Sequence, residues 1–358
     1  MAANKVMAVL GQLLQLLSRT GYRCSGLGHA PFANGPAGTL LHHNIIQTWW
    51  DKMVIKSEAS FPVSGKNINF LEDFYPTVLS FMNGTVPFAM VNVSECARPQ
   101  SVQGGTEIET LLNPGSETCL QYVHVCSPAS VNRTFDLVVN TRVSWWKQFS
   151  YNSSNFVQKT FDEGSTSVLH IQYNSSCGPI SIETISNRGH EDIDKVEERT
   201  GVNCKFRNGA KSSYPCLIEC QTSMELASAV FLMDAYTHNA LPGEGQGREV
   251  LHLHPVLVPY KVSVCHNGSK VRQIQEVVTY ICREFRKVGL SVLHNRDETN
   301  SLTAQVIRND EMGVPYTVLV SDETIDTGNI GLRNRDTSIQ ETVPIGKLTE
   351  YLLKHVHY

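Results

Sequence analysis

The most regular hydrophobic pattern in the chain lies between residues 271 and 288. Apolar residues recur there at intervals of three or four, at positions 271, 274, 278, 281, 285 and 288. This spacing places them on one face of an α-helix, and Gly289 follows at the point where such a helix commonly ends. The segment therefore predicts an amphipathic helix.

Short runs of apolar and β-branched residues surround this helix and predict strands. They cover residues 259–265, 290–293 and 315–320, and the last run is nearly continuous, as expected of a strand covered on both faces. Two further runs flank residues 334–336 and predict a hairpin, and residues 347–355 predict a closing amphipathic helix. Residues 257–358 thus predict a small α/β layer with a mostly parallel, mixed sheet.

The beginning of the chain has a different pattern. Apolar residues at positions 6, 10, 13, 14 and 17 form one helix face, with polar residues at 12, 15 and 18 opposite. Lys5, Arg19 and Arg23 are basic, and no acidic residue occurs before Asp51. An acid-free amphipathic helix with arginines is typical of a mitochondrial transit peptide, which we predict for residues 1–23. An ordinary first helix of the fold is the alternative.

Length and composition narrow the class of protein. A chain of 358 residues, 41% hydrophobic and 18% charged, favours two globular domains. The net charge of −4 gives no overall basic signature, so contact with nucleic acid would require a local patch. No apolar run reaches the roughly 18 residues of a membrane-spanning helix, and no membrane partner is expected. The ten cysteines are spread over a chain that can form a core, which favours free thiols over a disulfide scaffold.

Four stretches resemble one known family. They are Gly35-Pro-Ala-Gly38 followed by a helix ending in Trp49-Trp50, Arg142-Val-Ser-Trp-Trp-Lys-Gln-Phe149, Gly313-Val-Pro-Tyr-Thr-Val-Leu-Val320 and Gly331-Leu-Arg-Asn-Arg-Asp-Thr-Ser-Ile-Gln340. Together they resemble the accessory subunits of mitochondrial DNA polymerase gamma, which are related to glycyl-type class II aminoacyl-tRNA synthetases. The resemblance implies an α/β (α+β) fold. A class II synthetase-like antiparallel-sheet domain in residues 24–256 would precede an anticodon-binding-type domain in residues 257–358.

Synthetase chemistry depends on two arginines that neutralise the triphosphate of ATP. At the first position Arg98 is present, but Ala97 and Gln100 replace the aromatic residue and the glutamate of the motif. The second position falls in residues 219–234, which contain neither arginine nor glycine. A phosphate-binding junction needs backbone amides that approach closely and a cation to meet the phosphate, so we do not expect an enzyme.

The resemblance implies a non-catalytic processivity subunit. Such a protein binds the polymerase catalytic subunit and strengthens its hold on primer-template DNA in the nucleoid of the mitochondrial matrix. Only residues 57–86 stand where vertebrate members carry a helical dimerisation insertion, so a homodimer of the vertebrate type is not expected. Two other functions stay open, namely a synthetase-derived mitochondrial tRNA- or RNA-binding protein and an active glycyl-type tRNA synthetase.

Basic residues outside the closing domain are candidates for DNA binding. Contacts of this kind are sensitive to salt and blind to sequence, because they go to phosphates. The candidates are Arg142, Lys147, Lys205, Arg207 and Lys211. The neighbouring Trp145 and Trp146 form either a packed core or a surface on which bases stack.

Candidates for docking on the catalytic subunit lie in the last domain. They are Arg333, Arg335 and Asp336 at the predicted hairpin and Lys347 in the closing helix. The alternative is that Arg335 and Asp336 pair with each other and stabilise the turn. No cofactor or metal site is predicted, because the pair of histidines at positions 252 and 254 has no third ligand at a suitable spacing.

Overall fold

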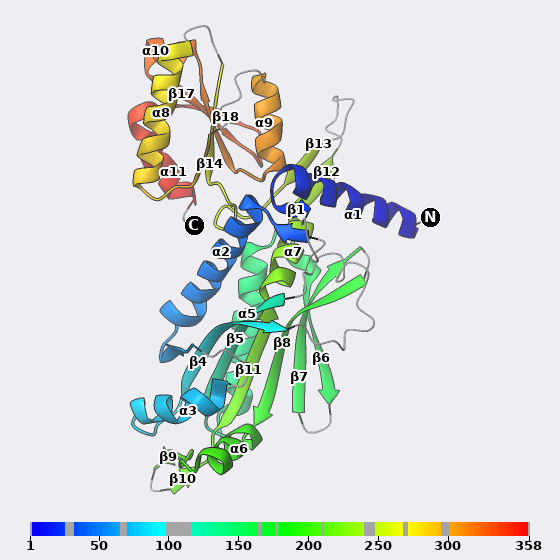
Figure 1. Ribbon diagram of the computed structural model, residues 1–358, viewed down its shortest axis with the longest axis vertical. Coiled ribbons are helices and arrows are strands. Elements are labelled where there is room, and N and C mark those ends of the chain that lie inside the picture. Colours follow the sequence, from blue (N-terminus) through cyan, green and yellow to red (C-terminus); the bar gives the residue numbers. More distant parts are fainter. Residues whose placement is uncertain are drawn as a thin grey trace.

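The computed structural model describes the chain outside residues 1, 26–31, 65–69, 98–115, 164–165, 177, 210, 240–247, 268–270, 295–300 and 357–358. The chain forms two domains, and Figure 1 shows the C-terminal domain above the larger first domain. The predicted α/β (α+β) fold class is confirmed. Arg98, the first of the two arginine positions considered above, falls outside the described residues.

The first domain is built on a seven-stranded sheet with the order β3-β4-β5-β11-β8-β7-β6. All neighbouring strands in it are antiparallel except β3 and β4, which run parallel. The strands are β3 (Ser60–Pro62), β4 (Phe88–Ala97), β5 (Ser116–Cys126), β6 (Phe156–Glu163), β7 (Thr166–Ser175), β8 (Gly178–Gly189) and β11 (Cys216–Ser223). This sheet agrees with the antiparallel-sheet domain that the resemblance implies.

Helices cover both faces of this sheet. On one face lie α2 (Pro36–Trp50), α5 (Val131–Phe149) and α7 (Met224–Ala235), and on the other lie α3 (Phe70–Phe81) and α6 (Glu191–Thr200). Successive side chains of a strand point to opposite faces, and β4 follows this rule: Ala89 and Val91 join the cluster with α2, α5 and α7, whereas Phe88 and Met90 join the cluster with α3 and α6.

The two neighbouring tryptophans of α5 belong to the core. Trp146 stacks on Phe231 with the ring centroids 5.2 Å apart, and Trp145 meets Phe149 edge to face at 5.6 Å. Both indole side chains are buried. Of the two alternatives for this pair, the structure therefore supports the packed core, because a surface on which bases stack must be open to solvent.

The C-terminal domain contains a five-stranded mixed sheet with the order β15-β14-β16-β17-β18. The first three strands are parallel and the last two pair antiparallel. The strands are β14 (Val262–His266), β15 (Val292–His294), β16 (Tyr316–Val320), β17 (Asn329–Asn334) and β18 (Gln340–Pro344). The helices are α8 (Val271–Lys287), α9 (Leu302–Glu311), α10 (Asp322–Thr327) and α11 (Ile345–Val356). The predicted helix, hairpin and closing helix are thus all present, whereas α9 and α10 were not predicted.

Shorter elements complete the fold. β1 (Arg23–Ser25) pairs with β2 (Phe32–Asn34), β9 (Phe206–Asn208) with β10 (Lys211–Ser213), and β12 (Tyr236–Asn239) with β13 (Arg248–Leu251). A five-residue π-helix, η1 (Asp51–Ile55), extends α2, and a single 3₁₀ turn, η2 (Ser153–Asn155), precedes β6. In Figure 1 the β12–β13 hairpin lies beside α9 and above α1.

The first helix, α1 (Ala2–Arg19), packs on the first domain near its junction with the second (Figure 1). The side chains of Leu10, Leu13, Leu16 and Leu17 are buried in the main core. This burial is what the alternative, an ordinary first helix of the fold, requires. The boundary of a transit peptide at residue 23 stays a prediction.

Two chemical properties of the chain bear on its environment. Free thiols, as predicted, are found at Cys24, Cys126, Cys204, Cys216, Cys220, Cys265 and Cys282. Cys119 is disulfide-bonded and departs from that prediction. Over the residues that the structure describes, no helix combines the length and the apolar character needed to cross a membrane.

Candidate functional site

The sheet face formed by β4, β5 and β11 is where the resemblance would place a nucleotide. Its centre is neutral: Asn92 and Gln121 are fully buried, and the Asn92 amide donates a hydrogen bond of 3.3 Å to Gln121 Oε1. At the junction of β11 and α7, Glu225 accepts a hydrogen bond of 2.9 Å from the Thr118 backbone N–H. A helix N-terminus that would otherwise attract phosphate therefore already has a carboxylate beside it.

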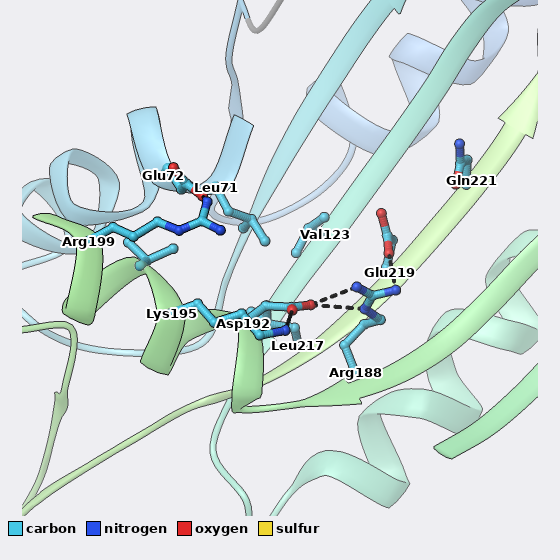
Figure 2. Close-up of a pocket in the computed structure, with 11 residues that line it drawn as sticks. Leu71, Glu72, Val123, Arg188, Asp192, Lys195, Arg199, Leu217, Glu219 and Gln221 are labelled. Carbon is cyan, nitrogen blue, oxygen red and sulfur yellow. Dashed lines mark hydrogen bonds and ion pairs between the residues drawn. The ribbon is translucent and has the colours of Figure 1, made fainter. Parts of the chain in front are cut away.

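A cavity of about 310 Å³ opens on this side of the sheet, between β5, β8 and β11 and the helices α3 and α6 (Figure 2). Arg188 contributes its guanidinium to Asp192 at 2.8 Å and approaches Glu219 at 3.8 Å. Lys195 pairs with Asp192 at 3.0 Å, and Arg199 pairs with Glu72.

The charges in this cavity compensate one another. Each of its three cations has a carboxylate partner, and burial raises the pKa of the Glu219 carboxyl. A polyphosphate needs cations that are not already paired, so the cavity of Figure 2 is poorly suited to ATP.

Arg142, one of the predicted DNA-binding residues, lies in the core of the first domain. Its side chain is fully buried and forms two hydrogen bonds with Glu183, of 2.7 and 3.1 Å. Trp146 donates its indole N–H to the same carboxylate at 2.5 Å. The prediction that Arg142 contacts DNA is therefore wrong: a guanidinium with this burial and these partners cannot reach a phosphate, and its role is to satisfy a buried carboxylate.

The other predicted DNA-binding residues fall into two separate places. Lys205, Arg207 and Lys211 are exposed at the β9–β10 hairpin, which Figure 1 shows at the end of the first domain remote from the C-terminal domain. Lys147 lies near the other end, where Phe149 of the same helix contacts His254 in the connection between the domains. The structure thus groups the three cations of the β9–β10 hairpin and leaves Lys147 apart from them. The contact of these four residues with DNA stays a prediction.

Two residues predicted to dock on a partner are instead engaged within the chain, Arg333 inside the C-terminal domain and Arg335 at the junction between the domains. Arg333 forms hydrogen bonds of 2.9 and 3.1 Å with Asp310, and its side chain is 10% exposed. Arg335 donates to the backbone carbonyls of Gly313 at 2.6 Å and Leu253 at 3.1 Å, and its side chain is 2% exposed. Both docking predictions are wrong for this conformation, because neither guanidinium is available to another protein.

Asp336 and Lys347 differ from these arginines in exposure. Asp336 accepts a hydrogen bond from Arg335 at 2.9 Å and pairs with the imidazole of His252 at 2.8 Å. Burial acts to raise the pKa of the Asp336 carboxyl, but the contacts with His252 and Arg335 outweigh it and hold this pKa well below the usual range. The alternative in which Arg335 and Asp336 pair with each other is therefore the one observed. Lys347 is exposed on α11, so its docking role stays a prediction.

The junction between the domains contains further charged residues that the sequence did not assign to any contact between domains. Arg19 of α1 pairs with Glu249 and, at 2.9 Å, with Glu311, and the Tyr22 hydroxyl donates to the Met312 carbonyl at 2.9 Å. Arg248 pairs with Asp310, the same carboxylate that meets Arg333. We call this set of residues, with Arg333, Arg335, Asp336 and His252, the interdomain clamp.

Apart from the neighbouring pair Arg335 and Asp336, no local pattern could have identified the clamp from the sequence. Its partners are far apart in the chain: 292 positions separate Arg19 from Glu311, and 82 separate Arg335 from Leu253.

The described residues contain no group of three or more His, Cys, Asp or Glu side chains that could hold a metal ion.

Comparisons with known proteins bear on both domains. The sequence profile of the anticodon binding domain matches residues 261–355. The DNA polymerase subunit gamma-2, mitochondrial, of Xenopus laevis is 26% identical over 97% of this chain and 86% of its own length, and that of Mus musculus is 24% identical over 92% of this chain and 84% of its own. A glycine–tRNA ligase of Staphylococcus haemolyticus strain JCSC1435 is 24% identical over 79% of this chain and 61% of its own length.

Proposed function

We propose that this chain, a relative of DNA polymerase subunit gamma-2 over almost its whole length, is the accessory subunit of a mitochondrial DNA polymerase gamma. The observation that chiefly supports the proposal is the similarity to subunit gamma-2 along 97% of the chain. The neutral sheet face and the cavity with paired charges agree with a protein that does not activate an amino acid.

In this function the chain catalyses nothing and acts through binding. It holds the catalytic subunit in a conformation that grips primer-template DNA, and it does so as one partner to one catalytic subunit in the mitochondrial matrix. A coupling free energy of about 1–3 kcal/mol between the two binding events would slow dissociation from DNA roughly 5- to 150-fold. Effects of this kind act mainly on the off-rate.

The interdomain clamp suits such a role. Accessory proteins that act by presenting two surfaces at a fixed distance need a rigid junction, and here charged and hydrogen-bonded contacts cross from Arg19 and Leu253 to Glu311 and Arg335. The basic trio at the β9–β10 hairpin offers a separate surface for DNA phosphates, which would be lost at high salt.

Dissociation of the polymerase from DNA tests this proposal. The catalytic subunit is bound to a labelled primer-template, challenged with excess unlabelled DNA, and followed with and without the chain. We expect the off-rate to fall by roughly 5- to 150-fold when the chain is present. An unchanged off-rate with a folded chain would contradict the proposal.

The match of residues 261–355 to the anticodon binding domain favours one second candidate, a synthetase-derived tRNA- or RNA-binding protein. That function predicts binding to one RNA that survives added salt, because base contacts carry part of the affinity. Filter binding with total mitochondrial tRNA in rising salt separates the two functions, since the accessory subunit is expected to show no such preference.

A further inference from the structure

A groove of about 600 Å³ opens on the first domain between η1, β5 and the outer face of α5. Its edges come from segments that are far apart in the chain, so the fold rather than a local motif creates it. The lining residues on which its chemistry depends are Lys52, Met53, Lys56, Arg133, Leu137 and Val138.

The middle of the groove is apolar and partly open to solvent. Met53, Pro87 and Val138 contribute to its floor, and Leu137 projects from α5 with 66% of its surface exposed. A large apolar side chain that is exposed beside an apolar groove can pack against a partner without any rearrangement of the domain.

The rim of the groove is basic. Lys52, Lys56 and Arg133 surround the apolar floor, and Glu58 is the acidic residue among the lining side chains. Arg188, Lys195 and Arg199 of the cavity in Figure 2 are paired with carboxylates, but within the described part of the chain none of these three rim cations forms an ion pair. A chain with a net charge of −4 therefore keeps a local excess of positive charge at this groove.

The shape of η1 produces this arrangement. Its backbone is wider than an α-helix, with the Lys56 N–H donating to the Asp51 carbonyl five residues earlier at 2.8 Å. The turn directs Met53 into the core and leaves both lysines at the rim. Single π-turns of this kind are frequent at functional sites.

We propose that this groove receives an acidic segment of the polymerase catalytic subunit, with a large apolar side chain that packs on Leu137 and carboxylates that meet Lys52, Lys56 and Arg133. The inference rests on the proposed function and deepens it by naming the surface and the chemistry of the partner. An apolar centre with a charged rim is the anatomy of a protein–protein interface.

The composition of the groove favours a protein segment over DNA. Contacts with duplex DNA go mainly to phosphates, which gain nothing from an apolar floor or from burial of Leu137. A peptide with apolar and acidic side chains uses both features: burial of its apolar side chain supplies affinity, and its carboxylates speed encounter with the basic rim.

Binding of the full-length chain to the catalytic subunit, measured by surface plasmon resonance, tests the inference with two variants and a control. Leu137→Glu places a like-charged group against the acidic segment, and the double variant Lys52→Glu, Lys56→Glu reverses the rim. Val202→Glu is the matched control, because Val202 is also exposed, at 47%, and does not line the groove. All of these positions are at or near the surface, and melting curves check that each variant folds.

We expect Leu137→Glu to weaken binding about tenfold or more, as substitution of an interface anchor does, and Val202→Glu to bind like the wild type. The lysine variant should lower the association rate and its dependence on salt. Wild-type affinity in both groove variants would overturn the inference while leaving the proposed function intact. The inference would also be overturned, in favour of a DNA surface, if the groove variants lost as much affinity for primer-template DNA in the absence of the catalytic subunit as they lose for the catalytic subunit. A wild-type chain that does not bind the catalytic subunit would refute the proposed function and the named partner together.

Discussion

Leu16 offers the sharpest test of whether the first helix belongs to the folded protein. Its side chain is fully buried in the core of the first domain, in a segment whose sequence also resembles a removable leader. Leu16→Ala removes three carbon atoms from this core and leaves a cavity. If α1 packs as the structure shows, the substitution must destabilise the first domain. If residues 1–23 are a leader outside the fold, it has no effect on stability.

The expected magnitude follows from burial. Replacement of a fully buried leucine by alanine costs about 2–5 kcal/mol, which combines the lost transfer free energy with the cavity term. Natural domains have a total stability of about 5–15 kcal/mol, so this loss is large. For a domain of this size the melting temperature should fall by about 2–4 °C for each kcal/mol.

Tryptophan fluorescence reads out this domain alone, because all four tryptophans lie in it, at positions 49, 50, 145 and 146. Urea unfolding of the wild type and of Leu16→Ala gives the difference in free energy directly. Val9→Ala is the control: Val9 lies on the same helix but is 41% exposed, and its substitution should cost less than about 0.5 kcal/mol. A free energy of unfolding for Leu16→Ala within about 0.5 kcal/mol of the wild type would refute the packing of α1.

Three further substitutions probe other parts of the structure. Arg142→Met leaves the Glu183 carboxylate buried without its cation and should cost about 3–5 kcal/mol in urea unfolding, whereas the double variant with Glu183→Gln should recover part of that loss; equal stability of Arg142→Met and wild type would contradict the buried pair. Arg335→Lys removes the guanidinium that binds two backbone carbonyls and Asp336, and so weakens the junction between the domains. Tryptophan fluorescence reports the first domain and far-ultraviolet circular dichroism reports both. The two probes should give separate unfolding transitions in the variant and coincident ones in the wild type. Burial lowers the pKa of Lys261 to about 7, below its value in the unfolded chain. Between about pH 7 and pH 10 the unfolded state therefore binds one proton more than the folded state. The free energy of unfolding should rise with pH in that window, by up to about 1.4 kcal/mol per pH unit. Lys261→Met should reduce that slope, and equal slopes in the two proteins would show that the ammonium group is not buried at a cost.

The parts of the fold that local pattern predicts are those in which one face is apolar. The helix α8 was predicted correctly because Ile274, Val278, Ile281 and Phe285 are all buried on the side that faces its sheet. The helix α9 was missed because its buried side is polar: Asn309 donates to Thr317 at 3.2 Å, and its neighbour in the chain is the carboxylate that meets Arg333. A helix whose inward face is made of hydrogen-bonding groups has no hydrophobic period to detect.

Charged residues were the least predictable part of the candidate site. A basic residue in a sequence is usually interpreted as part of a solvated or nucleic-acid-binding surface. Only the fold shows that Arg142 pairs with Glu183, which is 41 positions away in the chain. The same holds for Arg333 and Arg335, whose partners come from other elements and, for Arg335, from the other domain. Burial of these guanidinium groups depends on long-range contacts that a single sequence does not contain.

Product length in a single-encounter primer-extension assay tests the central claim most directly. The catalytic subunit of the mitochondrial polymerase is bound to a primer-template, and extension starts together with a trap that captures every enzyme molecule that dissociates. Addition of this chain should lengthen the products while the rate of nucleotide incorporation per step stays the same, because the accessory subunit acts on dissociation. Products of unchanged length in the presence of folded chain would contradict the account and direct the search to tRNA binding.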